Sequence, residues 1–318
     1  MAKSLLVVGS FVQDLTWNTP HFPQPGATVI GQFSTGPGGK GSNQAVAACR
    51  SGAPTAFVGA VGRDAFAEAA RLFHEQEGIQ SLWVNGRGAP TGTAGILVDA
   101  SGQNEIVVAL GANAQLRSDD VPEDLLRNAA ILICQLESDP DTVIALFQRA
   151  RRLGVTTLLN PAPMRADFPA ELLNLTDFLL PNETECLALL HQCTPTAAHR
   201  VSDAEAFNRL DSEALHTYCR ELGPPTVVVT LGARGCLVST ADRHQFIPAL
   251  KGIQVVDTTG AGDAFVGGFA HGLLRFQRDP FTAANYANTV AALAVTRSGT
   301  AGAMPHRDDI EQHWENTL

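Results

Sequence analysis

Short apolar runs alternate with helical patterns along most of this chain, and this alternation limits the folds that it can adopt. Residues 5–9 form an apolar run that ends in Gly-Ser, which is typical of a buried strand in a parallel sheet. From Asp119 onward the alternation is regular. We expect strands over about 131–134, 155–159, 178–180 and 226–231, and helices over about 119–129, 139–153, 183–191 and 203–222. This order predicts an α/β domain with a mostly parallel sheet and helices on both faces.

Further elements flank this regular region, and two segments interrupt the pattern. We expect helices over about 42–50, 64–78, 281–298 and 306–316, a strand over 56–62, and closing antiparallel strands over 236–240 and 245–248. Residues 11–37 contain many Pro and Gly, and residues 90–110 read as a β-hairpin. We expect these two segments to form a small β lobe on one α/β domain that spans residues 1–318.

The composition argues against several classes of function. Asp and Glu outnumber Lys and Arg by 32 to 22, and the sequence has no basic stripe that would bind nucleic acid. No apolar run approaches the roughly 20 residues of a membrane span, and the N-terminus reads as a strand rather than a signal peptide. The six cysteines are scattered, which indicates free thiols in a reducing compartment. We expect a soluble cytoplasmic protein without nucleic-acid or membrane partners.

Residues 255–265 combine a β-branched start, a Thr-Thr-Gly-Ala-Gly turn and a helical pattern of small residues. We interpret them as a strand, a glycine-rich turn and a helix start. Free N–H groups at a helix N-terminus bind anions, and glycine lets the backbone approach a phosphate. Asp263 lies in this turn, where a carboxylate suits a general base for a hydroxyl that attacks phosphate. The structural alternative is an ordinary helix start with an acid in its first turn.

Residues 36–41 match the pattern G-x-G-x-x-G, but they do not indicate a dinucleotide site. That fingerprint requires the glycines directly after the first strand, whereas about 26 residues separate Gly9 from Gly36. The segment also lacks the glycine spacing of a P-loop. Lys40 and Asn43 are three residues apart at a helix start and suit a polyhydroxylated ligand, although a plain glycine turn is the alternative. The sequence contains neither the H-E-x-x-H zinc motif nor the G-x-S-x-G motif of hydrolases.

Several polar residues follow predicted strands, where α/β folds place ligand-binding groups. Asp14 follows the first strand and Glu137 follows residues 131–134, although each also fits an ordinary turn or helix entry. Asn182 and Glu185 have the spacing of a capping box, which is a complete structural explanation, but they also suit a water-coordinated Mg²⁺ near phosphates. Residues 230–235 allow a nucleotide to approach, or form a hairpin turn.

Together these segments resemble the ribokinase family of ATP-dependent sugar and nucleoside kinases, the phosphofructokinase-B superfamily. The resemblance covers nearly the whole chain. Its signature regions are residues 38–59 and 257–265, with shorter matches at 111–114, 135–137, 160–163, 182–185 and 294–297. The resemblance implies a three-layer αβα domain and a lid, formed by about 11–37 and 90–110, that closes over the sugar and pairs two subunits as a homodimer.

The resemblance also implies a role for individual residues. Asp263 matches the catalytic base, and the anion hole for the transferred phosphoryl group is matched by Gly260, Ala261 and Gly262. Sugar-binding positions, besides Asp263, are matched by Asp14, Gly39, Lys40, Asn43 and Glu137. ATP-binding positions are matched by Asn182, Thr230, Gly232, Gly235, Gly262 and Asn288. Glu185 matches a position that binds Mg²⁺ through water, and a monovalent-cation site, usually for K⁺, is matched by Asp257, Thr259, Ala294, Arg297 and Gly299.

The implied reaction is ATP-dependent phosphorylation of D-ribose at O5. Two departures bear on it, because Val12 stands where many bacterial members carry a sugar-binding Asn, and Ala303 stands where members often carry Ser near the cation loop. One alternative is a kinase of the same fold for deoxyribose, a hexose or a nucleoside. Others are a catalytically silent sugar- or nucleotide-sensing module and a dinucleotide-dependent oxidoreductase, which the misplaced glycine motif disfavours.

Overall fold

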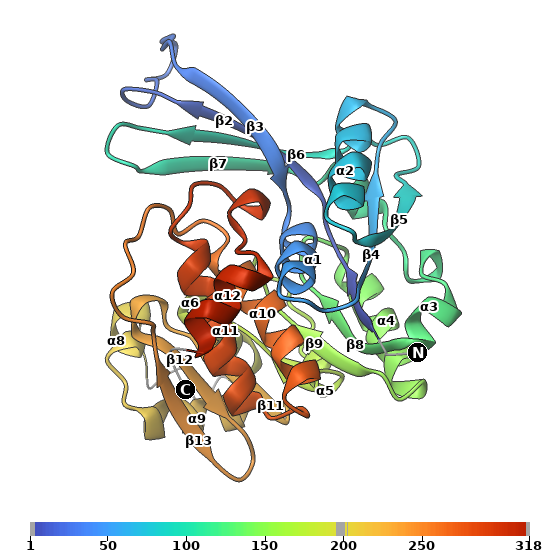
Figure 1. Ribbon diagram of the computed structural model, residues 1–318, viewed down its shortest axis with the longest axis vertical. Coiled ribbons are helices and arrows are strands. Elements are labelled where there is room, and N and C mark those ends of the chain that lie inside the picture. The colour runs from blue at the N-terminus through green and yellow to red at the C-terminus, as the bar shows by residue number, and fades with distance from the viewer. Residues whose placement is uncertain (1–3, 195–200, 202, 316–318) are drawn as a thin grey trace.

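A nine-stranded sheet forms the centre of the protein in a computed structural model that describes residues 4–194, 201 and 203–315 (Figure 1). Its strand order is β13-β12-β11-β10-β9-β8-β1-β4-β5. The strands from β11 to β5 are parallel, while β12 and β13 close one edge as antiparallel strands. The strands are β1 Ser4–Val8, β4 Thr55–Val61, β5 Gln80–Asn85, β8 Ala129–Cys134, β9 Thr156–Leu159, β10 Phe178–Leu179, β11 Thr226–Thr230, β12 Gly235–Ser239 and β13 His244–Pro248.

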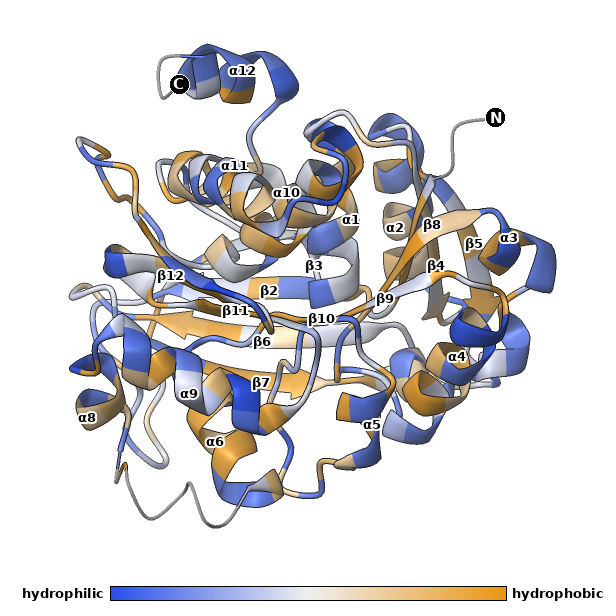
Figure 2. Cartoon of the chain, turned by 90° about the horizontal axis from the view of Figure 1, so that it is seen from below, coloured by the Kyte–Doolittle hydropathy of each residue, from blue (hydrophilic) through white to orange (hydrophobic). Residues whose placement is uncertain are grey.

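Helices cover both faces of this sheet, so the predicted three-layer α/β class is confirmed (Figure 2). One face carries α1 (Lys40–Arg50), α10 (Ala261–Arg275) and α11 (Pro280–Ala294), with α12 (Arg307–Glu315) packed against α11. The other face carries α4 (Pro140–Arg152), α5 (Glu171–Asn174), α6 (Glu183–Cys193) and α9 (Ser212–Leu222). Strand side chains alternate between the two cores: Leu6 and Val8 enter one, and Leu5 and Val7 enter the other. This double burial explains the continuous apolar runs in the sequence.

The glycines of α10 allow the helices on one face to pack closely. A Cβ atom at Gly267 would lie 2.6 Å from Ala47 Cβ on α1. Cβ atoms at Gly268 and Gly272 would lie 2.8 Å from atoms of Val290 and Ala283 on α11. The small-residue pattern after Asp263 is therefore a packing requirement, and it holds the N-terminus of α10 beside that of α1.

A separate four-stranded sheet, which we call the small sheet, lies at the end of the molecule near β4 and α2 (Ala65–Gln76) (Figure 1). Its order is β3-β2-β6-β7, from β2 (Val12–Asn18), β3 (Gln32–Gly38), β6 (Gly92–Val98) and β7 (Asn104–Ala109). β2 and β6 are parallel, whereas β3 and β7 pair antiparallel at the two edges. Residues 11–37 and 90–110 thus provide the β lobe that the sequence predicts, and β6 and β7 form the expected hairpin.

Three helix predictions are wrong in extent. The helix expected over 281–298 ends at Ala294, and residues 295–298 form turns and bends. Residues 203–222 form two helices, α8 (Ala204–Asn208) and α9, because Asp211 caps a new helix by accepting a hydrogen bond from the amide of Ala214. Residues 119–129 form only a short turn of 3₁₀-helix, Ser118–Asp120, and α3 (Glu123–Arg127). Pro122 explains the break, because the residue before proline is disfavoured in helical geometry. None of the helices in the described ranges has the length and apolar character that a membrane span requires.

The strand predicted at the start of 255–265 is also wrong. Val255 and Val256 lie in an irregular segment outside both sheets, and each is 59% exposed. The amides of Val256 and Asp257 both donate to the carbonyl oxygen of Val295, at 2.8 and 3.2 Å, so α11 anchors this segment rather than a neighbouring strand. The helix start is confirmed, because α10 begins at Ala261.

Candidate active site

Two helix N-termini meet beside the carboxyl ends of the parallel strands. α1 begins after Gly39, whose φ is 89°, and α10 begins after Gly260, whose φ is 79°. Both values lie in the left-handed region that favours glycine. The amide of Ser42 donates to the Ser10 carbonyl oxygen at 2.9 Å, which ties α1 to the turn after β1. Because the first N–H groups of a helix lack intrahelical partners, this region carries a positive potential suited to anions.

Asp263 lies in the first turn of α10 and is only 6% exposed. Its Oδ2 accepts a hydrogen bond from Asn43 Nδ2 at 3.0 Å, and its Oδ1 accepts one from Gln44 Nε2 at 2.9 Å. Both donors belong to α1. The carboxylate is therefore held in one orientation, with the remaining lone pairs of its oxygens available to a further donor.

An amide network that was not predicted from the sequence lies behind Asp263. Gln44 Nε2 also donates to Asn160 Oδ1 at 3.0 Å, and Gln44 Oε1 accepts from Gln135 Nε2 at 2.5 Å. Asn160 Nδ2 in turn donates to the Leu180 carbonyl oxygen at 2.9 Å. One signal was available, since Gln44 lies four residues after Lys40 and therefore on its helix face, beside Asn43.

Two further acids lie close to Asp263, and the ammonium of Lys40 faces the group. Glu137 Oε2 accepts hydrogen bonds from the backbone amide of Lys40 at 3.0 Å and from the hydroxyl of Ser10. Asp14 lies on β2, where burial raises its pKa to about 6, with the nearby charges of Glu137 and Asp263 acting in the same direction. The charge of Asp263 raises the pKa of Lys40, although burial opposes this. The Lys40 side chain therefore stays a cation among carboxylates.

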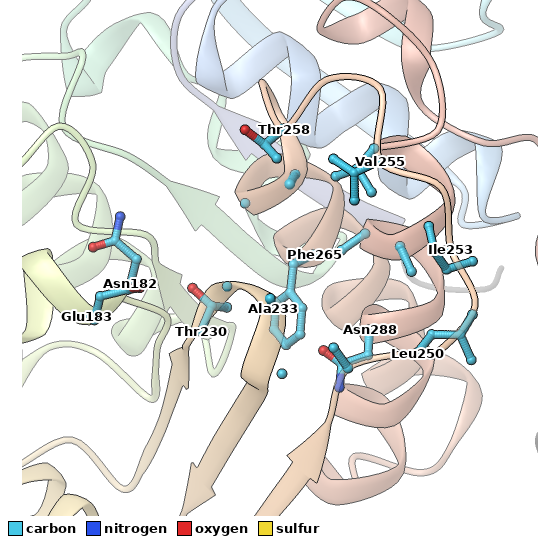
Figure 3. A pocket seen from close by; sticks show the side chains of 18 of the residues that line it. Asn182, Glu183, Thr230, Ala233, Leu250, Ile253, Val255, Thr258, Phe265 and Asn288 are labelled. Atoms are coloured by element: carbon cyan, nitrogen blue, oxygen red, sulfur yellow. The ribbon is translucent and has the colours of Figure 1, made fainter. Parts of the chain in front are cut away.

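A cavity of about 180 Å³ adjoins Asp263, and a larger one of about 500 Å³ lies next to it. The smaller cavity is lined by, among others, Lys40, Asn160, Asn182, Glu185, Gly260, Gly262 and Asp263. The larger cavity is mostly apolar, with Leu250, Ile253, Val255 and Phe265 around the amide of Asn288 (Figure 3). Asn182, Thr230 and Gly262 line both cavities. A long ligand can thus extend from the apolar cavity to Asp263, and the larger volume suits a cofactor-sized group.

The structure brings the predicted residues together in three groups. The larger cavity is lined by all six positions that the sequence matched to ATP, namely Asn182, Thr230, Gly232, Gly235, Gly262 and Asn288. Of the predicted sugar-binding positions, Lys40 and Asp263 line the smaller cavity. Asp14, Gly39, Asn43 and Glu137 line neither cavity and lie on the α1 side of Asp263. The apolar residues of the larger cavity were not predicted.

Asn182 and Glu185 satisfy the capping box and also line the smaller cavity. The Glu185 amide donates to Asn182 Oδ1 at 2.8 Å, and the Asn182 amide donates to Glu185 Oε2 at 2.9 Å. Burial raises the pKa of Glu185 to about 7. Across the described ranges no group of three metal-binding side chains occurs. A single carboxylate beside an amide fits Mg²⁺, which keeps most of its own waters.

Asp257 organises the loops matched to the cation site. Its Oδ1 accepts from the amide of Thr259 at 2.9 Å and its Oδ2 from the amide of Gly299 at 3.0 Å. Burial alone would raise the pKa of Asp257, but these hydrogen bonds outweigh it and lower the pKa. Arg297 directs its side chain away to Asp309 at 2.8 Å, and the Ala294 carbonyl oxygen accepts from the Arg297 amide at 3.3 Å. The carboxylate of Asp257 thus links three of the five predicted positions, and the other two, Ala294 and Arg297, are linked to each other.

Comparisons with known proteins identify the family of this arrangement. The model of the pfkB family of carbohydrate kinases matches residues 2–307. The chain belongs to this family. It is 36% identical to the ribokinase of Mus musculus, covering 97% of this chain and 94% of that protein, and 33% identical to the deoxyribokinase of Salmonella typhi, covering 97% and 98%. The structure of Arabidopsis thaliana ribokinase complexed with ribose and ATP superposes with a TM-score of 0.83 at 31% identity, covering 98% of each chain.

Membership of the pfkB family confirms the family that the sequence predicted. It also confirms that the chain is an ATP-dependent carbohydrate kinase, and it favours this class over the dinucleotide-dependent oxidoreductase. The mostly apolar cavity and the smaller polar cavity beside it share Gly262, at the N-terminus of α10.

Proposed function

We propose that the protein transfers the γ-phosphoryl group of ATP to O5 of D-ribose, with Asp263 as the general base. The observation that carries this proposal is the place of Asp263 in the smaller cavity, directly after Gly262, which lines both cavities. A nucleotide in the larger cavity would direct its phosphates towards the N-terminus of α10. Phosphoryl transfer depends mainly on positioning and on charge stabilisation, so a base and an anion cradle can supply most of the catalysis.

The turn of Gly260, Ala261 and Gly262 is the proposed anion hole. The Ala261 amide donates to the Thr258 carbonyl oxygen at 3.2 Å, whereas Gly262, whose amide lies at a helix start, lines both cavities. Glu185 and Asn182 are the residues that would hold a water-coordinated Mg²⁺. Bound there, Mg²⁺ would neutralise phosphate charge. The ammonium of Lys40 lines the same cavity and adds a fixed cation.

An unpaired acceptor supports a sugar on the α1 side of Asp263. Asn43 is 4% exposed, and its Oδ1 has no hydrogen-bond partner among the described residues. A buried unpaired acceptor is costly unless a ligand donates to it. Asp14, Gly39, Lys40, Asn43 and Glu137 would together receive the hydroxyl groups of ribose. Val12 is buried at the start of β2, and its side chain has no polar group that could bind a hydroxyl. We therefore expect Asp14 and Asn43 to make most of the side-chain hydrogen bonds to the sugar at this end of the site.

A panel of acceptors tests the proposed substrate. Ribose, 2-deoxyribose, fructose and adenosine would each be supplied with Mg-ATP, and kcat/KM would be measured by ADP release. We expect ribose to exceed the others by at least tenfold. A hexose or nucleoside that exceeds ribose by tenfold would contradict ribose as the substrate and leave a kinase of the same fold for that acceptor.

We expect activity to fall in mildly acidic solution. The pKa of Asp14 is raised to about 6 and that of Glu185 to about 7, mainly by burial. Glu185 therefore becomes protonated as the pH falls through 7, and Asp14 as it falls through 6. Glu185 then loses the charge that would accept hydrogen bonds from metal-bound water, and Asp14 the charge that would accept them from a sugar hydroxyl. We expect kcat/KM for ribose to be at least about tenfold lower at pH 5 than at pH 8. A profile that stays flat between these values would contradict the assigned roles.

We propose a monovalent-cation site, with K⁺ as the expected ion, around Asp257, Thr259, Ala294, Arg297 and Gly299. A cation there would brace the turn that leads into α10, because Asp257 already links Thr259 to Gly299. We expect kcat to rise several-fold when K⁺ replaces choline, and Asp257→Ala to remove this response. Asp242→Ala, in the exposed turn between β12 and β13, serves as the control. Equal rates in K⁺ and choline would contradict the site.

We propose that the small sheet acts as a lid and pairs two subunits. It exposes Trp17, Phe33, Ile106 and Val107, with Val107 76% exposed, and large exposed apolar patches mark interaction surfaces. We expect light scattering to give twice the 33.6 kDa chain mass, and Phe33→Glu to give the monomer. Leu72→Glu, which changes an exposed apolar residue of α2, should leave the dimer intact. A wild-type monomer at micromolar concentration would exclude the dimer.

We also propose that the protein acts in the cytoplasm. All six cysteines are free thiols, and Cys134, Cys186, Cys219 and Cys236 are buried. Free buried cysteines are typical of proteins in a reducing compartment.

A further inference from the structure

Thr300 joins the far end of the chain to the small sheet. Its hydroxyl lies 3.0 Å from Asp14 Oδ2 on β2 and 3.0 Å from the carbonyl oxygen of Pro37 on β3. Thr300 precedes the 3₁₀ turn Ala301–Ala303, in the segment between α11 and α12 that reaches the small sheet in Figure 1. No sequence pattern indicates this contact, because Thr300 lies 286 positions after Asp14.

The hydroxyl of Thr300 fixes one oxygen of the Asp14 carboxylate and leaves the other free. A threonine hydroxyl has a single hydrogen, and a carboxylate is a stronger acceptor than a carbonyl oxygen. Asp14 Oδ2 therefore takes most of this hydrogen bond, and the Pro37 carbonyl oxygen is a second acceptor that keeps the hydroxyl in place. No other hydrogen bond to the Asp14 side chain occurs among the described residues. Oδ1 thus remains available to a ligand.

The backbone of β3 is shaped to allow this contact. A Cβ atom at Gly38 would lie 2.6 Å from Asp14 Cγ, so a side chain at that position would displace the carboxylate. The negative charges of Glu137 and Asp263 lie near Asp14 and raise its pKa. The ammonium of Lys40 interacts with those two acids. The Thr300 hydrogen bond opposes the effect of burial and of these charges on the pKa of Asp14. Without the hydroxyl, less of the carboxylate would be ionised near neutral pH.

The same segment contacts the turn before α10. A Cβ atom at Gly260 would lie 3.5 Å from Thr300 Cα, and the amide of Gly299 donates to Asp257 Oδ2 at 3.0 Å. Residues 299 and 300 therefore touch both the acid on β2 and the turn at the junction of the two cavities. These contacts hold Thr300 in place, so its hydroxyl keeps a constant position relative to Asp14.

We propose that Thr300 is a positioning residue for sugar binding, whose hydroxyl orients Asp14 and holds it ready to receive a pair of sugar hydroxyls. This inference rests on the proposed role of Asp14 in binding the sugar. It assigns to the segment between α11 and α12 a direct part in acceptor recognition, in addition to its contact with Asp257.

Matched substitutions at Thr300 test the proposal. Thr300→Val keeps the shape of the side chain but removes the hydroxyl, and Thr300→Ser keeps the hydroxyl. Ribose binding would be measured by calorimetry at pH 6.0, 7.0 and 8.5, with thermal unfolding as the check that each variant folds. We expect Thr300→Val to raise the Kd for ribose about 5- to 20-fold at pH 7, with KM for ATP unchanged, and Thr300→Ser to stay within about twofold of wild type.

The pH dependence separates positioning from packing. If the hydroxyl holds Asp14 ionised, the ratio of Kd values between Thr300→Val and wild type should grow as the pH falls from 8.5 to 6.0. A ratio that does not change with pH, or equal losses in the Val and Ser variants, would overturn the proposal. If Thr300→Val does not fold, Thr300→Ala gives the same comparison with Thr300→Ser.

If ribose is not the substrate, the binding data would differ from those that overturn the role of Thr300. Wild-type protein would then bind ribose no better than other acceptors, and the same comparison would be made with the best acceptor of the panel. With that acceptor, an unchanged Kd in Thr300→Val would overturn the role of Thr300, whereas a pH-dependent loss would support it.

Discussion

Replacing Asp263 with Asn should lower kcat by about 10²- to 10⁴-fold, the range that a general base contributes. Asparagine has nearly the same shape and keeps a carbonyl oxygen for one of the donors Asn43 and Gln44, but its amide cannot accept the proton of the attacking hydroxyl. Binding of ATP should change little, because the larger cavity is lined by other residues. Steady-state kinetics with ribose and calorimetry with a non-hydrolysable ATP analogue would measure both quantities.

The Asp263→Asn result also decides between enzyme and sensor. A catalytically silent sensing module would bind sugar or nucleotide in wild-type form without releasing ADP, and Asp263→Asn would leave its function intact. Residual activity above a tenth of wild type in the Asn variant would contradict the assignment of the base. Thermal unfolding would check that the variant folds, since Asp263→Asn removes one of the two buried hydrogen bonds from Asn43 and Gln44.

Replacing Gly41 with Ala should destabilise the protein by about 2–4 kcal/mol, as expected for forced backbone movement in a packed region. A Cβ atom at Gly41 would lie 2.6 Å from the amide nitrogen of Ser10 and 2.7 Å from the carbonyl carbon of Gly9. These are backbone atoms, so relief requires α1 to move away from the turn after β1. That movement would break the Ser42 amide contact to Ser10 and shift the Lys40 amide away from Glu137.

Urea unfolding measures this effect, and ribose calorimetry shows its consequence for the site. Gly36→Ala is the matched control, because Gly36 has ordinary φ and an added Cβ atom would meet nothing within 4 Å. We expect Gly36→Ala to change the free energy of unfolding by less than about 1 kcal/mol. If Gly41→Ala unfolded at the same urea concentration as Gly36→Ala, the close packing of α1 on the turn after β1 would not contribute to the free energy of unfolding.

The sequence predicted the fold well where one residue pattern determines the structure. The parallel strands are buried on both faces, so β1 and β8 appear as uninterrupted apolar runs. The pattern was misleading at Val255 and Val256, because β-branched residues predict a strand even in an exposed segment, where Val255 lines the wall of the larger cavity. The break before Asp211 was missed because helical periodicity continues across it, and only the side-chain cap marks the new helix.

The candidate site was predictable to the extent that its residues sit in local motifs. Asp263 and Gly262 could be placed from a glycine turn before a helix, and Asn182 and Glu185 from the spacing of a capping box. The structure shows that capping does not exclude a place in the cavity, since both residues cap α6 and line the smaller cavity. Gln135 and Thr300 could not be placed from the sequence, because their contacts join segments distant along the chain.

The most direct test of the account is a crystal structure of the protein with ribose, Mg²⁺ and a non-hydrolysable ATP analogue. The account predicts that the O5 hydroxyl of ribose lies about 2.6–3.2 Å from an Asp263 carboxylate oxygen, with the terminal phosphate at the N-terminus of α10. It also predicts the adenine base in the larger cavity, near Asn288. A complex in which O5 points away from Asp263, or in which the terminal phosphate lies away from Gly262, would contradict the account.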